Sequence, residues 1–186
     1  REFNLPDAFP EEVLDEARRR AAAFSDNDFA DRVDLRELTT ITIDPTDARD
    51  FDDAISLEMI GAGFWRLSVH IADVGHFVPP QSAIDAEARE RATSVYLPDR
   101  VLPMLPEVIS NNVASLQPGK PRLAKTAIID FSPEGIRVGT ELARTVIRSD
   151  RRFTYEEVDD FLANPEAWST KLDAPVFELL GRMRDL

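Results

Sequence analysis

Two runs of alternating apolar and polar residues, separated by a glycine-rich turn, restrict the fold of this 186-residue chain more than any other feature. The apolar positions are Ile55, Leu57 and Met59 in the first run and Trp65, Leu67, Val69 and Ile71 in the second. Successive side chains of a strand point to opposite faces of a sheet, so each run predicts a half-buried strand. The turn Gly61-Ala62-Gly63 between the two runs predicts an antiparallel β-hairpin.

The rest of the chain alternates between helix and strand patterns and contains no internal repeat. Apolar spacing predicts helices over residues 10–24, 82–91, 154–164 and 176–186, with a shorter helical segment over 108–116. Further strands are predicted over 38–44, 124–131 and 136–147, and Ser132-Pro133-Glu134-Gly135 forms the turn between the last two. These elements favour an α/β (α+β) fold in which helices flank a mixed β-sheet.

Local signals fix where several of these elements begin and end. Ser82 and Thr154 are predicted helix N-caps, and Glu157 completes a capping box with Thr154. The polar stretch 25–36 predicts a connector. Three prolines interrupt residues 96–106, so we expect an ordered, extended loop without regular secondary structure there.

The last helical pattern continues to the end of the sequence. Its apolar stripe is formed by Val176, Leu179, Leu180, Met183 and Leu186, and no C-cap residue follows. We therefore expect the chain to be a fragment whose apolar stripe continues, or packs against another segment, beyond Leu186.

Composition limits the classes of function. The net charge is −13, from 35 acidic and 22 basic residues, which disfavours a broad electrostatic grip on nucleic-acid backbones or anionic membranes. The absence of cysteine favours a reducing compartment. No apolar run approaches the roughly 18 residues of a spanning helix, so we expect a cytoplasmic protein.

The most unusual stretch is IDPTDARDFDD, which places five carboxylates close together with Arg49 as the one basic residue among them. The carboxylates are those of Asp44, Asp47, Asp50, Asp52 and Asp53. Such groups repel one another unless water screens them or a cation joins them. In an extended backbone Asp50 and Asp52 project to the same face about 7 Å apart, and carboxylate oxygens suit a hard cation such as Mg²⁺.

Two other acidic motifs are disfavoured by the spacing. A helix-loop-helix calcium loop that starts at Asp44 would need Gly and Glu where Arg49 and Ile55 stand. An aspartyl-phosphate nucleophile would need a second Asp two residues after Asp44. A solvated acidic turn and a magnesium site both remain open from spacing alone.

Three blocks of sequence give the chain a specific resemblance. TITIDPTDARDFDDAISLE, LSVHIADVGHFV and ATSVYLPDRVLPMLPEVISNNVASLQPG follow one another between residues 40 and 119. In this order they closely resemble the catalytic domain of the ribonuclease II and ribonuclease R family of exoribonucleases. On this basis residues 1–38 are expected to form a helical lead-in and connector, and residues 39–186 the N-terminal part of that catalytic domain.

The resemblance implies an activity and roles for the aspartates. The activity is magnesium-dependent 3′-to-5′ hydrolysis of single-stranded RNA to nucleoside 5′-monophosphates. Asp44, Asp50 and Asp53 match the family's metal-binding carboxylates, Asp52 matches its essential catalytic aspartate, and Asp50 and Asp53 are counted with it as catalytic. Asp47 stands where the family pattern is open, so we expect a solvated charge.

Three further residues are candidates outside the acidic stretch. Tyr96 resembles the family tyrosine that stacks on the terminal nucleotide, although without that resemblance it is more typical of a tyrosine packed beneath a proline-rich loop. His70, on the polar side of the hairpin, is expected to be a hydrogen-bonded structural histidine. Asp73 is expected to orient the loop that follows the hairpin.

The resemblance also implies what this chain does not contain. The family's catalytic domain continues past the position of Leu186 with an arginine-bearing motif and a glutamate near the reacting phosphate, and RNA-binding domains of the OB type flank it. The chain alone is therefore expected to be incomplete as a nuclease. The alternative function is that of a catalytically silent RNA-binding or assembly module with the same fold.

Overall fold

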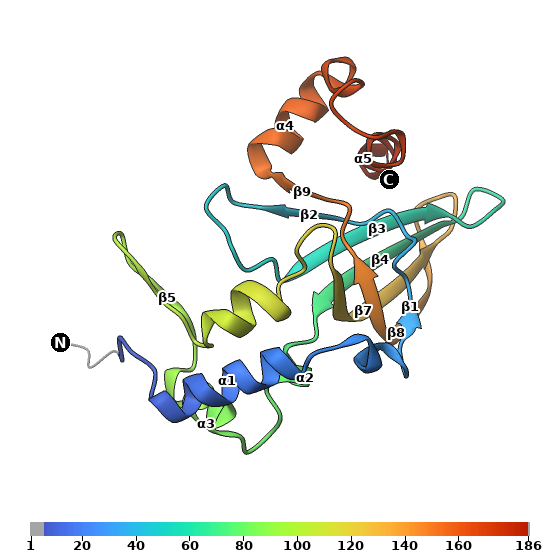
Figure 1. The fold of residues 1–186 in the computed structure, drawn as a ribbon. Coiled ribbons are helices and arrows are strands. Elements are labelled where there is room, and N and C mark those ends of the chain that lie inside the picture. The colour runs from blue at the N-terminus through green and yellow to red at the C-terminus, as the bar shows by residue number, and fades with distance from the viewer. Residues whose placement is uncertain (1–5, 186) are drawn as a thin grey trace.

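A seven-stranded mixed sheet forms the centre of the molecule in the computed structural model, which describes residues 6–185 (Figure 1). The strand order is β1-β8-β7-β4-β3-β2-β9. The strands of the sheet are β1 (Val33–Asp34), β2 (Ile41–Asp44), β3 (Asp53–Met59), β4 (Trp65–Ala72), β7 (Pro121–Phe131), β8 (Arg137–Arg148) and β9 (Arg151–Thr154). The pairs β1–β8 and β2–β9 are parallel and the other neighbours antiparallel, which confirms the predicted mixed sheet.

The predicted hairpin is confirmed as β3 and β4. Ile55 pairs with Val69 and Leu57 with Leu67. Gly61 and Gly63 have positive φ angles of 99° and 81°, a backbone conformation that residues other than glycine rarely adopt. The glycine-rich sequence therefore allows the tight reversal that keeps the two strands in register.

The helices form two groups (Figure 1). They are α1 (Glu11–Ala23), α2 (Val74–Phe77), α3 (Ala83–Arg91), α4 (Tyr155–Ala163) and α5 (Ala174–Asp185), with 3₁₀ turns at Asp26–Phe29 and Pro165–Trp168 and a π-helical turn at Ile109–Val113. α4 and α5 lie near β9 at one edge of the sheet, and α1, α2 and α3 lie together on the other side of the molecule. None of the helices in residues 6–185 combines the length and the apolar character that crossing a membrane requires.

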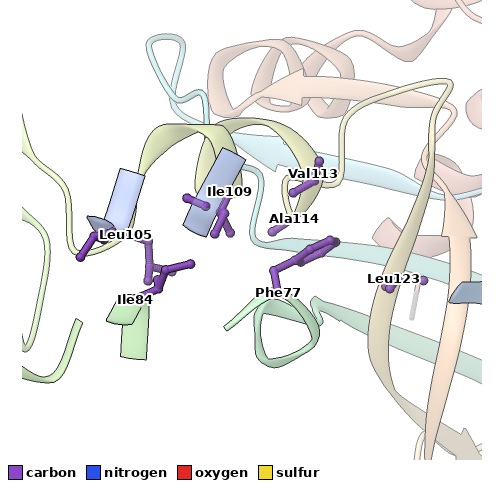
Figure 2. Packing of buried hydrophobic residues seen from close by; sticks show 9 residues of the cluster. Phe77, Ile84, Leu105, Ile109, Val113, Ala114 and Leu123 are labelled. Atoms are coloured by element: carbon purple, nitrogen blue, oxygen red, sulfur yellow. The ribbon is translucent and has the colours of Figure 1, made fainter. Parts of the chain in front are cut away.

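Each helix group packs its own buried cluster. Phe77, Ile84 and Ile109 lie in the cluster that α1, α2, α3 and the π-helical turn share (Figure 2). The second cluster joins α4 and α5 to the face of the sheet that carries Ile41 and Leu57. The helices predicted over 10–24, 82–91, 108–116, 154–164 and 176–186 are thus present with small shifts of their ends, and Leu186 lies outside the described residues.

The predicted caps are confirmed. Ser82 Oγ accepts a hydrogen bond from the backbone N–H of Asp85 at 3.1 Å. Thr154 and Glu157 form a reciprocal capping box, with N···O distances of 3.1 and 2.9 Å. Thr154 ends β9 and begins α4, so this box fixes the point at which the chain leaves the sheet beside β2.

The prediction that residues 96–106 contain no regular structure is wrong for a short part of the stretch. Val95–Tyr96 (β5) pairs with Val101–Leu102 (β6) in a small antiparallel ribbon. Pro98 and Pro103 lie outside the paired residues, so they remove no N–H group from the ribbon. The ribbon matters for function because it carries Tyr96.

Two strands of the main sheet were not predicted. The connector over 25–36 contains β1, and β9 lies just after β8. β1 has two residues and β9 has four, so neither is long enough to show a clear alternation of apolar and polar residues.

Candidate functional site

The acidic stretch joins two neighbouring strands. Asp44 is the last residue of β2, as predicted, and Asp53 is the first residue of β3. The two strands are antiparallel neighbours, so the chain between them leaves and re-enters the sheet at the same end. The loop 45–52, which we call the acidic loop, therefore holds Asp50 and Asp52 near the two strand ends.

Asp44 is the buried member of the group. Its side chain is 7% exposed, and its Oδ2 atom has no hydrogen-bond partner among residues 6–185. Burial raises the pKa of Asp44 most, and the negative charges of Asp53 and Asp50 raise it further. The neighbouring hydroxyl of Thr42 and the charge of Arg152 oppose this increase, but the pKa stays above its ordinary value. A buried carboxylate oxygen without a donor is unfavourable on its own and suits a cation ligand.

Asp52 keeps contact with solvent, but it lies within the same electrostatic environment. Partial burial raises the pKa of Asp52 most, and the negative charges of Asp50, Asp53 and Asp44 raise it further. Asp50 is half-buried and Asp53 is exposed. Four of the five carboxylates therefore lie close enough together to raise the pKa of another member, whereas Asp47 is simply exposed, as expected for a solvated charge.

Tyr96 is brought to the same place from a distant part of the sequence. The charge of Asp50, then burial, then the charge of Asp52 raise the pKa of its hydroxyl. Its side chain is 69% exposed, so the ring is not packed beneath the proline-rich loop. An exposed aromatic ring beside carboxylates offers a stacking surface for a base.

An open hollow adjoins the acidic loop. It has a volume of about 600 Å³ and is lined by Ala48, Arg49 and Phe51 of the loop together with Glu107, Val108, Asn111, Gln117 and Pro118. Arg49, Phe51 and the two amides are groups that contact phosphates and bases, whereas the carboxylate of Glu107 disfavours a phosphate close to it.

The carboxylates of the acidic stretch offer oxygen ligands for a divalent cation. The hydrogen-bond vacancy at Asp44 Oδ2 and the cluster of carboxylates fit a hard cation with oxygen ligands. In the described part of the chain, however, no three or more His, Asp or Glu side chains converge closely enough to form a metal site by themselves. The carboxylates of this chain therefore suit one part of the coordination shell of a divalent cation.

His70 lies at the centre of a buried chain of hydrogen bonds on the sheet face that carries Asp44. Its Nε2 lies 2.9 Å from Ser56 Oγ, and its Nδ1 lies 2.8 Å from Thr126 Oγ1. Thr40 Oγ1 continues the chain on the Ser56 side at 2.8 Å, and Thr145 Oγ1 continues it on the Thr126 side at 2.7 Å. The side chain of His70 is fully buried, which confirms the expectation of a hydrogen-bonded structural histidine.

The ends of this chain assign the neutral tautomer of His70. Thr40 donates to the carbonyl of Leu38 at 2.9 Å, so Ser56 must donate to Thr40 and the imidazole must donate from Nε2 to Ser56. With this tautomer Thr145 donates to Thr126, so the only hydrogen bond of the chain that is lost is the long one of 3.3 Å from Thr145 Oγ1 to the carbonyl of Ala124. The opposite tautomer would lose the shorter bond at Leu38.

Asp73 follows β4 and forms a buried ion pair. Its Oδ2 accepts from Arg32 Nη2 at 2.6 Å, and the two side chains are 4% and 1% exposed. Burial by itself would raise the pKa of Asp73, but the hydrogen bond and charge of Arg32 and the charge of Lys125 lower the pKa overall. Asp73 therefore joins the connector around Arg32 to the end of the hairpin.

The fold and this site define a class of protein, an α+β domain whose central sheet carries an aspartate-rich loop with an exposed tyrosine within reach of its charges. The model of the RNB domain family matches residues 32–184, so the chain belongs to the RNB domain family. A ribonuclease R of Chlamydia muridarum is 42% identical over 185 residues, which is 100% of this chain and 26% of that protein.

Solved structures share the fold. Mycoplasma genitalium RNase R, in complex with ribose-methylated single-stranded RNA, matches with a TM-score of 0.87 and 34% identity over 95% of this chain and 27% of its own. Yeast Ssd1, described as a pseudonuclease, matches 76% of this chain and 18% of its own with a TM-score of 0.70, and at 19% identity it shows the fold alone. The chain thus spans about a quarter of the length of the ribonuclease R relatives.

Proposed function

We propose that the complete protein, of which this chain forms a part, is a magnesium-dependent exoribonuclease that degrades single-stranded RNA from its 3′ end. The observation that carries the proposal is the grouping of Asp44, Asp50, Asp52 and Asp53 with Tyr96 at the carboxyl end of β2. The similarity to ribonuclease R, including one solved with single-stranded RNA, supports it.

Asp44, Asp50 and Asp53 are the proposed ligands of the cation. Their oxygens suit Mg²⁺, which commonly takes its remaining ligands from water and phosphate. When bound, the cation would neutralise negative charge on the phosphate and would lower the pKa of a water molecule that it binds. It also explains how a chain with a net charge of −13 accepts an anionic substrate at this place.

Asp52 is the proposed catalytic residue, with Asp50 and Asp53 beside it. Water attacks the phosphorus of the terminal linkage, the bond from phosphorus to the 3′-oxygen breaks, and a nucleoside 5′-monophosphate leaves. The carboxylate of Asp52 takes the proton that the water loses, and the 3′-oxygen of the shortened RNA gains a proton from solvent. The raised pKa of Asp52 supports a role as a proton acceptor, because a stronger base accepts a proton more readily.

Tyr96 is proposed to hold the terminal nucleotide by stacking against its base. Stacking on an aromatic ring contributes about 1–3 kcal/mol per base and tolerates every base, as a sequence-independent nuclease requires. The exposed ring beside Asp50 and Asp52 supports this role.

We further propose that residues 1–38 are a lead-in to a catalytic domain that begins at 39 and is completed beyond this chain, with flanking OB-type domains. The match of this chain to about a quarter of ribonuclease R supports further domains outside this chain, but it does not bear on the boundary at residue 39. A cytoplasmic location fits the absence of cysteine.

One variant tests the catalytic role. Asp52→Asn in the complete protein removes the proton acceptor with little change in size, so the rate of mononucleotide release from an end-labelled RNA should fall by about 10²–10⁴-fold. RNA affinity, measured by fluorescence anisotropy in EDTA, should stay within a few fold of the wild type. An unchanged rate would refute the assignment of Asp52.

The second candidate is a catalytically silent RNA-binding module, because the same fold occurs in a protein described as a pseudonuclease. The two candidates differ in turnover. Release of mononucleotides that depends on added Mg²⁺ would support the exoribonuclease, whereas RNA retention without products, with or without metal, would support the silent module.

A further inference from the structure

Arg152 lies beside the acidic loop and contacts it through its guanidinium. It belongs to β9, which runs parallel to β2 at the edge of the sheet (Figure 1). Arg152 pairs in register with Thr42, and Thr154 pairs with Asp44. The backbone of Arg152 therefore lies beside β2, and its long side chain reaches Pro45, where the acidic loop begins.

The guanidinium contacts both ends of the acidic loop. Arg152 Nη2 donates a hydrogen bond to the carbonyl oxygen of Pro45, the residue directly after Asp44. The guanidinium also lies over the ring of Phe51, with its central carbon 5.5 Å from the ring centre. Phe51 stands between Asp50 and Asp52, so one side chain holds the start and the end of the loop.

Arg152 approaches the carboxylates without pairing with them. Its charge is close enough to lower the pKa of Asp44, yet Asp44 Oδ2 has no hydrogen-bond partner among residues 6–185. Nε of Arg152 is likewise buried without a hydrogen-bond partner in this part of the chain. A guanidinium normally satisfies its donors with a carboxylate when one is near. Here the backbone carbonyl of Pro45 takes the bond and the Asp44 oxygen stays free for another ligand.

We propose that Arg152 is a positioning residue, which fixes the acidic loop through Pro45 and Phe51 so that its carboxylates are arranged for a divalent cation. The proposal rests on the proposed function of the acidic site. The proposal goes beyond that function because it assigns the preorganisation of the acidic loop to β9, a strand that supplies none of the expected metal ligands.

Charge alone would have the opposite effect, which makes the proposal testable. A positive charge near the site repels a divalent cation, so its removal by itself should strengthen cation binding. Loss of the contacts to Pro45 and Phe51 loosens the loop and should weaken binding. The direction of the change therefore separates positioning from simple electrostatics.

The experiment compares Arg152→Gln and Arg152→Lys with the wild type in the complete protein. Mn²⁺ serves as the probe, with affinity measured by titration calorimetry and by the loss of the free-ion EPR signal. Both variants should bind Mn²⁺ about tenfold more weakly, because lysine keeps the charge but not the flat, forked group that reaches Pro45 and stacks on Phe51. Arg148→Gln is the matched control, since Arg148 lies on β8 and pairs at 3.6 Å with the exposed Glu37.

A second variant separates positioning from a general loss of structure. Phe51→Leu removes the ring but keeps an apolar side chain, and combined with Arg152→Gln it should weaken Mn²⁺ binding by less than the product of the single effects. Melting temperatures and RNA affinity in EDTA identify variants that fail to fold. Mn²⁺ affinity that stays equal or increases in folded Arg152→Gln would overturn the proposal. Wild-type protein that binds Mn²⁺ but releases no nucleotides would contradict the proposed function alone.

Discussion

The buried histidine at the centre of the sheet predicts a specific loss of stability in acid. His70 is fully buried and contacts only neutral groups through its ring nitrogens, the hydroxyls of Ser56 and Thr126. Burial lowers the pKa of His70 to about 4 from an ordinary value of 6.5. Protonation would place a charge inside the sheet with no carboxylate to compensate it.

The magnitude follows from the difference between the folded and unfolded pKa values. A lowered pKa means that the unfolded chain binds the proton more tightly, so the contribution of His70 is complete above pH 6.5 and declines as the pH falls toward 4. Each pKa unit corresponds to about 1.4 kcal/mol, so the free energy of unfolding should fall by about 3 kcal/mol across this window. Below about pH 4 the contribution of this residue should level off.

Urea unfolding followed by tryptophan fluorescence measures this loss. The free energy of unfolding of this chain would be determined between pH 7.5 and 4.5, for the wild type and for His70→Gln, which keeps hydrogen-bonding capacity but does not titrate. The raised pKa values of Asp44 and Asp52 act in the opposite direction, so the difference between the two proteins is the quantity of interest. Parallel pH profiles for the two proteins would refute the reasoning.

Two further predictions concern Asp73 and Tyr96. Asp73→Ala should lower the free energy of unfolding by about 3–5 kcal/mol, because Arg32 would remain buried without its partner, and urea titration should show less than about 1 kcal/mol for the exposed control Asp34→Ala. Equal losses for the two variants would contradict the importance of burial. Tyr96→Ala should weaken binding of single-stranded RNA in EDTA by about 1–3 kcal/mol while Tyr96→Phe retains it, and an anisotropy titration that finds both variants equal to the wild type would exclude stacking.

Sequence patterns predicted the parts of the fold that depend on near neighbours. The hairpin of β3 and β4 follows from alternation and from glycines at Gly61 and Gly63, and the start of α4 follows from the capping pair Thr154 and Glu157. Each of these signals lies within a few residues of the structure that it determines. Such local signals can be recognised without knowledge of the tertiary fold.

The parts that were missed depend on distant partners. β9 is short, and its place in the sheet comes from parallel pairing with β2, more than a hundred residues earlier in the chain. Nothing in the sequence near Arg152 indicates its partners, whereas the fold sets it against Pro45 and Phe51. The aspartates were visible because they are contiguous in sequence. The approach of Tyr96 to them was implied by family resemblance and could not have come from spacing.

The two polar systems of the sheet meet at β2, and this explains how a crowded acidic site is held. Thr40, Thr42 and Asp44 share one face, because alternate residues of a strand point the same way. Thr40 is fixed by hydrogen bonds to Leu38 and Ser56, at the end of the chain through His70. Asp44, at the other end of the strand, keeps a buried oxygen without a partner. The strand is thus anchored where its hydrogen bonds are complete and leaves its last carboxylate available for a ligand.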